Sequence, residues 1–222
     1  MFQKNKIWNF NDATIEEIDS VMHQSWKAFH AYRKLSLKQR ADFMRAIAAE
    51  IENLGDELLK ITGEETNLPE ARLRNERART MFQLTSYAEA CERGEWLEAR
   101  IDTAIADRNP PKPDIRKMLV PLGPVVVFGA SNFPFAYSTR EAIPPVLLRQ
   151  VAPVVVKAHP AHAGTSTLVA TAIAKAAEKN KYAGGCLCSC ERNGNAVGEA
   201  LIKHPLTKAV GFTGSFMGGK QL

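Results

Sequence analysis

An apolar run that ends in a turn of small residues, PLGPVVVFGASNFP at positions 121–134, most constrains how this chain can fold. Residues 125–128 are unbroken valine and phenylalanine between glycine and proline, which is typical of a strand buried on both faces of a parallel sheet. Ligands of open α/β sheets bind at the carboxyl ends of the strands. The following turn, 129–134, therefore holds Asn132 where a ligand can reach it.

Two more short strands are predicted after this one. Residues 152–157 form a second apolar run that ends in Lys157, and residues 208–212 form a third that leads into the glycine-rich turn TGSFMGG at 213–219. Helical patterns begin at Gly164 and at Asn195. The alternation predicts a parallel α/β arrangement of the nucleotide-binding type.

The N-terminal half reads as helices. Residues 13–32 carry one apolar stripe at helical spacing, and Ser36 opens a second helix with a capping-box pattern, S-x-x-Q, that breaks near Asn67. A third helix is predicted from Pro69 to about Trp96. Its arginines alternate with acids, which favours a solvated helix with ion pairs over an anion-binding face.

A proline-rich stretch, residues 106–114, has no periodicity and is interpreted as the seam between two segments. We therefore expect a helical segment at 1–113 and an α/β nucleotide-binding core at 114–222. An edge strand is predicted at residues 115–120, just after the seam.

Composition excludes several classes of protein. The 222 residues are 45% hydrophobic and 24% charged, and the net charge of +5 is scattered rather than clustered, so we expect no nucleic-acid partner. No apolar run is long enough for a membrane span and no signal peptide is recognisable, so a cytoplasmic protein is expected. The four cysteines lack zinc-site spacing and are interpreted as free thiols, with no metal site: Cys91, Cys186, Cys188 and Cys190.

Three turns at strand ends carry groups suited to chemistry. Asn132 offers an amide donor to an oxyanion, Lys157 a cation near a ribose, and Gly214 with Ser215 backbone N–H groups for a diphosphate. Each also has a purely structural interpretation as an ordinary turn or strand-end residue. No G-x-G-x-x-G fingerprint decides between them.

Together these motifs resemble the aldehyde dehydrogenase superfamily. The resemblance rests on PLGPVVVFGASNFPFA, VVVKAHPAHAGTS and KAVGFTGSxxGG, with supporting text in AFHAYRKLSLKQRADFMRAIAAEIENLGDELL and EETNLPEARLRNER. Within the superfamily the chain is most similar to bacterial α-ketoglutaric semialdehyde (2,5-dioxovalerate) and NADP-dependent fatty aldehyde dehydrogenases. The resemblance implies a Rossmann-like NAD(P)-binding sheet, a nicotinamide cofactor, a small aldehyde substrate and an oligomer.

The resemblance also implies a role for each motif residue. Asn132 matches the oxyanion-stabilising asparagine, Lys157 the lysine at the adenosine ribose, and Gly214, Ser215 and Gly219 the turn at the pyrophosphate. Pro160 stands where many NAD-preferring relatives have a glutamate. Because that carboxylate would repel a 2′-phosphate, the resemblance implies a preference for NADP over NAD.

The family's nucleophilic cysteine and general-base glutamate both match positions beyond Leu222. We therefore expect a fragment truncated before the catalytic domain and before the strand that completes the oligomerisation sheet, and hence inactive on aldehydes. Two alternatives remain: a non-catalytic NADP-binding module, and an interaction partner of a full-length relative.

Two windows depart from the family's text between matching flanks. At 138–151 the chain reads STREAIPPVLLRQV, and at 181–192 it reads KYAGGCLCSCER, which we expect to remove a buried strand. Compensating frameshifts of the encoding DNA are our hypothesis for both windows.

Overall fold

The computed structural model describes residues 13–136, 153–182, 187–190 and 195–221. The α-helices are α1 Ile15–Tyr32, α2 Leu37–Asn53, α3 Gly55–Thr66, α4 Glu70–Arg93, α6 Ala163–Lys179, α7 Asn195–Lys203 and α8 Phe216–Gln221. The strands are β1 Arg100–Asp102, β2 Ile115–Lys117, β3 Val125–Phe128, β4 Val154–Lys157, β5 Leu187–Cys190 and β6 Ala209–Phe212. Short 3-10 helices are η1 Glu95–Leu97 and η3 Pro160–His162.

The central sheet has the strand order β5-β4-β3-β6, and each neighbouring pair is parallel. Strand β3 lies between β4 and β6, and all four of its side chains are buried. This confirms the prediction that the valine-rich run is a strand covered on both faces. A parallel strand needs such cover, because its crossover connections place helices over the sheet.

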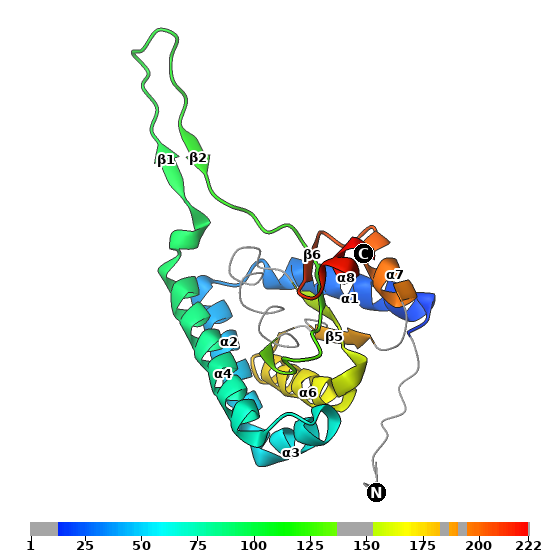
Figure 1. Cartoon of the computed structure of the whole chain (residues 1–222). Coiled ribbons are helices and arrows are strands. Elements are labelled where there is room, and N and C mark those ends of the chain that lie inside the picture. Colours follow the sequence, from blue (N-terminus) through cyan, green and yellow to red (C-terminus); the bar gives the residue numbers. More distant parts are fainter. Residues whose placement is uncertain (1–12, 137–152, 183–186, 191–194, 222) are drawn as a thin grey trace, which may run out of the picture.

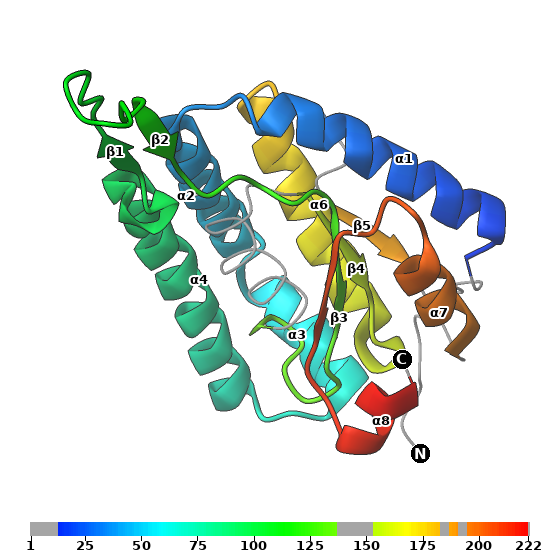
Figure 2. The same ribbon diagram turned by 90° about the horizontal axis from the view of Figure 1, so that it is seen from above.

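Alternate side chains of β3 and β4 enter two separate cores. Val125, Val127 and Val156 pack in a cluster with α2, α4 and α6, whereas Val126 and Val155 pack with α1 and α7. Figure 2 shows the resulting layers, with α1 and α7 on one side of the strands and α6, α2 and α4 on the other. The predicted α/β fold, N-terminal helices followed by a parallel sheet, is therefore confirmed.

Local signals set the starts of α1 and α2. Thr14 and Glu17 exchange side-chain and backbone hydrogen bonds at the start of α1, and Ser36 and Gln39 do the same for α2. The single helix predicted from Ser36 to about Asn67 is instead two helices, α2 and α3. They are divided at Gly55, whose φ of 61° is outside the helical range.

The proline-rich stretch forms the outer part of a β-hairpin, and the division of the chain at this stretch stays a prediction. Strands β1 and β2 pair antiparallel, and Ile105 pairs with Lys112 nearer the tip. Figure 1 shows this hairpin projecting from the helical body. The predicted edge strand shortens to β2 and belongs to this hairpin, not to the central sheet. Three-residue strands that are exposed throughout have no apolar alternation for a sequence pattern to detect.

The expectation that the divergent text at 181–192 removes a strand is wrong. Strand β5 pairs in parallel with β4, with Val154 opposite Leu187. A sheet ladder is made by main-chain groups, so text unlike the family's still supplies its donors and acceptors. The other divergent window, 138–151, lies outside the described residues.

Among the helices that the structure describes, none combines the length and apolar character needed to cross a bilayer.

Candidate functional site at the carboxyl edge of the sheet

The three candidate turns leave one edge of the sheet. In the strand register Phe128 lies opposite both Lys157 and Phe212, so β3, β4 and β6 end at the same level. The Asn132 turn follows β3, Lys157 is the last residue of β4, and the Gly214 turn follows β6. The fold thus brings these turns to the edge where parallel α/β sheets bind their ligands.

The Asn132 turn is attached to α4 through its backbone. Asn132 itself is exposed, while Arg72 Nη2 donates a 2.6 Å hydrogen bond to its carbonyl oxygen. The same guanidinium lies over the Phe133 ring, 5.1 Å from its centroid. Sequence reasoning placed Arg72 on a solvated, ion-paired face. That interpretation holds for Arg74, which pairs with Asp56 and Glu70.

Glu76 lies four residues after Arg72 on α4 and holds the far end of the Asn132 turn. One carboxylate oxygen accepts from the backbone N–H groups of Phe135 and Ala136, at 2.8 and 2.9 Å. The side chain is 5% exposed, and burial raises the pKa of this carboxyl, opposed by those two N–H groups and by Arg72 and Arg79. Its spacing from Arg72 (i, i+4) was visible in the sequence, but its burial was not.

The loop after β4 carries two stacked imidazoles beside Lys157. Lys157 is partly buried, and its carbonyl oxygen accepts from Gly129 N–H at 3.0 Å. His162 is fully buried and its Nε2 donates to the Ala130 carbonyl oxygen, 2.9 Å away. The rings of His162 and His159 are stacked with centroids 5.6 Å apart. His162 therefore joins the β4 loop to the β3 turn, a contact that sequence reasoning missed.

We expect His159 to make stability depend on pH. Burial, followed by electrostatic repulsion from His162 and Lys157, lowers the pKa of His159 from 6.5 to about 4. The unfolded chain therefore binds a proton between these values and the folded chain does not, so stability falls as pH drops from 6.5 to 4. We expect a loss of about 2 kcal/mol, discounted for the partial exposure of the ring.

Urea unfolding of wild type and His159→Asn between pH 4 and 7.5 measures this loss. The asparagine variant lacks the titrating ring, so its stability curve should be flatter in that window. Parallel curves for the two proteins would contradict the assignment.

Glu65 of α3 fixes the start of α6. Its two carboxylate oxygens accept from Gly164 N and Thr165 N, at 2.7 and 2.8 Å, and Thr165 Oγ1 donates a further bond of 2.6 Å. The first free N–H groups of α6 are therefore satisfied by a side chain 99 residues earlier. Because Glu65 occupies these N–H groups, they are not available to bind a ligand.

The glycine-rich segment packs around an aromatic ring. A Cβ on Gly214 would lie 2.6 Å from Phe212 Cζ, and one on Gly219 would lie 3.3 Å from Phe212 Cε1. Ser215 Oγ accepts from Gly218 N–H at 3.1 Å, so Ser215 caps α8. Gly219 lies inside α8 rather than in the predicted turn, which ends at Ser215.

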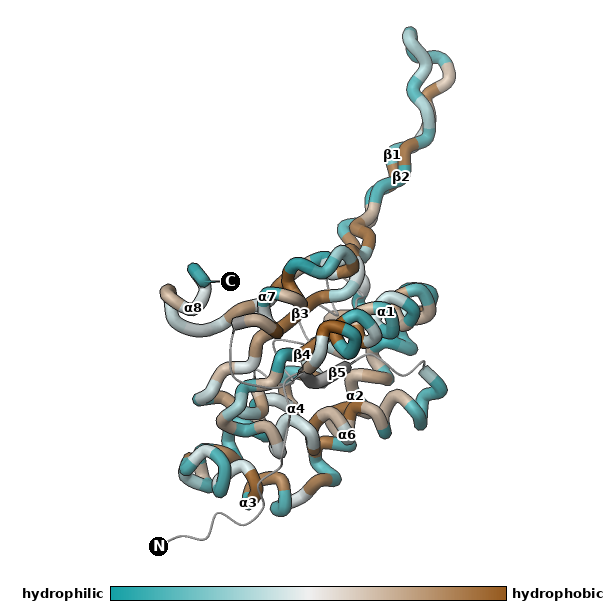
Figure 3. The backbone as a smooth tube through the Cα atoms, turned by 90° about the vertical axis from the view of Figure 1, so that its right-hand side faces the viewer, coloured by the Kyte–Doolittle hydropathy of each residue, from teal (hydrophilic) through white to brown (hydrophobic). Residues whose placement is uncertain are grey.

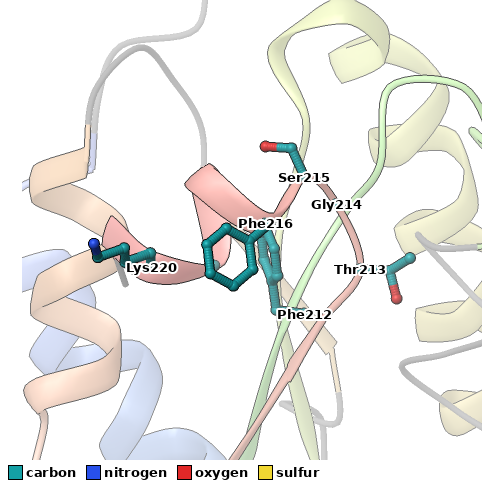
Figure 4. Close-up of a pocket in the computed structure, with 7 residues that line it drawn as sticks. Phe212, Thr213, Gly214, Ser215, Phe216 and Lys220 are labelled. Carbon is teal, nitrogen blue, oxygen red and sulfur yellow. The ribbon is translucent and has the colours of Figure 1, made fainter.

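A shallow pocket of about 590 Å³ opens at this segment. It is lined by residues 212–216, Gly219 and Lys220. In Figure 4 the Phe216 ring lies between Ser215 and the Lys220 ammonium group. Lys220, which sequence reasoning did not single out, adds a cation to the candidate diphosphate turn.

The described cysteine side chain, that of Cys91, is unsuited to nucleophilic attack. It is fully buried in α4, its Sγ donates to the Leu37 carbonyl oxygen at 3.7 Å, and burial raises the pKa of its thiol. Cys91 is thus part of the core.

A cluster of Asp19, His23 and His204 has the residue types of a metal site. Leu206 N–H donates to Nδ1 of His204, which leaves the proton of the neutral ring on Nε2, 3.3 Å from Asp19 Oδ1. A donor in that position suits a hydrogen bond between α1 and the end of α7, not a metal ligand. The absence of a metal stays a prediction.

A parallel sheet covered by helices on both faces, with its free turns at the carboxyl edge, defines a doubly wound α/β protein of the Rossmann-like class. The chain belongs to the aldehyde dehydrogenase family, whose model matches residues 2–222. Proteins of this family use NAD(P) as cofactor.

Curated relatives and solved structures agree with this membership. The chain is 43% identical over 214 residues to an α-ketoglutaric semialdehyde dehydrogenase of Acinetobacter baylyi, covering 96% of this chain and 40% of that protein. A second such enzyme, from Azospirillum brasilense, is 45% identical, with 96% and 41% covered. The chain thus spans about 40% of the length of these relatives.

Solved structures of low sequence identity share the fold. A glyceraldehyde-3-phosphate dehydrogenase of Methanocaldococcus jannaschii, solved with NADP, superposes with a TM-score of 0.81 at 20% identity, covering 96% of this chain and 44% of that one. A benzaldehyde dehydrogenase of Corynebacterium glutamicum gives a TM-score of 0.79 at 20% identity, covering 95% and 42%.

Proposed function

We propose that these 222 residues carry the cofactor-binding part of an NAD(P)-dependent aldehyde dehydrogenase and do not by themselves oxidise aldehydes. The alignment of three strand ends at Phe128, Lys157 and Phe212 carries the proposal, because it gathers the Asn132, Lys157 and Gly214 turns at one edge. A cofactor bound there would supply the hydride acceptor. The chain's own residues would bind and orient it.

The residues at this edge fit an anionic dinucleotide. The pocket at the glycine-rich segment is lined by both Ser215 and Lys220, and a hydroxyl and an ammonium group are donors suited to a diphosphate. Lys157 adds a second cation at the end of β4. We assign Lys157 to the ribose, and Gly214, Ser215 and Gly219 to the pyrophosphate. Pro160, which starts η3 without a carboxylate, supports a preference for NADP over NAD.

The proposed lack of turnover rests on the missing nucleophile. Asn132 would donate to an oxyanion, but that oxyanion forms only after a thiolate attacks the aldehyde. Cys91 is buried, and burial raises the pKa of its thiol. By the family resemblance, the nucleophilic cysteine and the general-base glutamate would match positions beyond Leu222. In these 222 residues alone, no oxyanion would therefore form for Asn132 to stabilise.

We expect NADP to bind without aldehyde oxidation. Quenching of tryptophan fluorescence on titration with NADP should be saturable in the micromolar range, whereas mixing the chain with NADP and a short semialdehyde should give no rise in absorbance at the NADPH wavelength. Lys157→Met should weaken the binding, and Lys181→Met, an exposed lysine away from this edge, should not. Steady NADPH production by the purified chain would refute the inactive assignment, and failure to bind NADP would refute the cofactor assignment.

A second candidate function, pairing with a full-length relative, is favoured by the hairpin. Apolar side chains along it and the segment that follows are exposed: Ile101, Ile105, Ile115, Met118, Val120 and Leu122. Figure 3 shows hydrophobic positions along this projecting arm. Co-purification with the Acinetobacter baylyi enzyme tests this candidate, and an arm variant with Ile101→Ser and Ile115→Ser is its control.

A further inference from the structure

We propose that Arg72 and Glu76 are positioning residues that hold the Asn132 turn from α4, an inference that rests on the proposed role of Asn132. The two side chains lie one helical turn apart on α4, so they share one face of it. Both reach residues about 60 positions later, and both make hydrogen bonds to the backbone of the turn, while the Arg72 guanidinium also lies over the Phe133 ring.

Arg72 and Glu76 hold different parts of the turn. Arg72 donates to the carbonyl oxygen of Asn132 itself, so the main chain of that residue is held while its side chain stays exposed. Glu76 accepts from two successive N–H groups, those of Phe135 and Ala136, in a buried setting where lost bonds are costly. The other end of the turn is held separately, by His162 at Ala130.

The positive charge of Arg72 stabilises the negative charge of Glu76. Burial disfavours the Glu76 carboxylate, and the positive charge of Arg72 opposes that effect. A neutral side chain with the same oxygen still accepts both N–H groups, whereas alanine leaves two donors unpaired. Variants of Glu76 can therefore distinguish the effect of its hydrogen bonds from the effects of its charge and of its packing.

Hydrogen–deuterium exchange of the full 222-residue chain tests the proposal. Glu76→Ala should speed exchange in peptides covering 129–136 at least tenfold, with α2 and α6 peptides little changed, and Glu76→Gln should restore near wild-type rates. Arg72→Met should speed exchange in the same peptides. Arg74→Met is the matched control, because Arg74 lies on the same helix but pairs with Asp56 and Glu70, and it should have no effect there.

A pH titration by NMR adds a signature that packing alone would not produce. The amide proton shifts of Phe135 and Ala136 should titrate together with Glu76 in the wild type, above the usual range for a glutamate, and should not do so in Glu76→Gln.

Several outcomes would overturn the proposal. These are unchanged exchange at 129–136 in Glu76→Ala, equal effects of Arg72→Met and Arg74→Met, or loss of protection throughout the chain in both Glu76 variants. A tenfold loss of NADP affinity in Arg72→Met with normal exchange would make Arg72 a cofactor ligand instead. If the wild type binds no NADP, the proposed function fails while the exchange result still decides whether the turn is held.

Discussion

Glu65→Ala is expected to lower the free energy of unfolding by about 2–4 kcal/mol, although Glu65 lies neither in the sheet nor in a candidate turn. The substitution removes three hydrogen bonds to a carboxylate, from Gly164 N, Thr165 N and Thr165 Oγ1. It also removes a negative charge from the positive end of α6. Thr165 is fully buried, so water cannot easily replace the lost acceptor.

Equilibrium urea unfolding followed by tryptophan fluorescence measures this loss. Glu64→Ala is the control, since Glu64 is the exposed neighbour on α3, and it should change stability by less than about 0.5 kcal/mol. Glu65→Gln should fall between the two, because its amide keeps one acceptor and turns a donor toward an N–H. Equal midpoints for Glu65→Ala and Glu64→Ala would show that the cap contributes nothing.

Gly214→Ala is expected to weaken NADP binding about tenfold, which corresponds to about 1.4 kcal/mol of binding free energy. The new Cβ would lie 2.6 Å from Phe212 Cζ, too close for any real contact. Phe212 is 39% exposed, so its ring can swing outward into the pocket that it lines. Unfolding free energy should therefore fall by only about 1 kcal/mol while the pocket changes shape.

Two further variants separate this clash from other effects of a glycine substitution. Gly63→Ala places its Cβ 3.8 Å from Leu73 Cδ1, an ordinary contact, and should leave NADP affinity unchanged. Combining Gly214→Ala with Phe212→Leu shortens the clashing side chain and should recover part of the affinity. If the double variant binds no better than Gly214→Ala, the ring is not the cause.

Much of the framework follows from neighbours along the chain. The capping box at Ser36 and the valine runs of β3 and β4 were predicted from the sequence. The division at Gly55 and the hairpin around residues 106–114 were not. In the first case one backbone angle decides the break. In the second, exposed strands leave no apolar period to read.

The sequence likewise predicted some features of the candidate site and missed others. Motif positions placed Asn132, Lys157 and Gly214 at or just after strand ends, and the register of β3, β4 and β6 puts those ends level. The functions of these three residues stay predictions. Ser215 turned out to cap α8, a role that depends on where that helix starts.

The sequence by itself determined the fold class, the strand that presents Asn132 and the membership of the aldehyde dehydrogenase family, because these depend on local periodicity and on motifs within short stretches. The tertiary structure alone decided what holds the site together. Arg72 reaches Asn132 and Glu65 reaches Gly164 across 60 and 99 residues. Such contacts depend on how α3 meets the start of α6 and how α4 meets the turn after β3. These surfaces come together only on folding, so no pattern along the chain predicts the contacts.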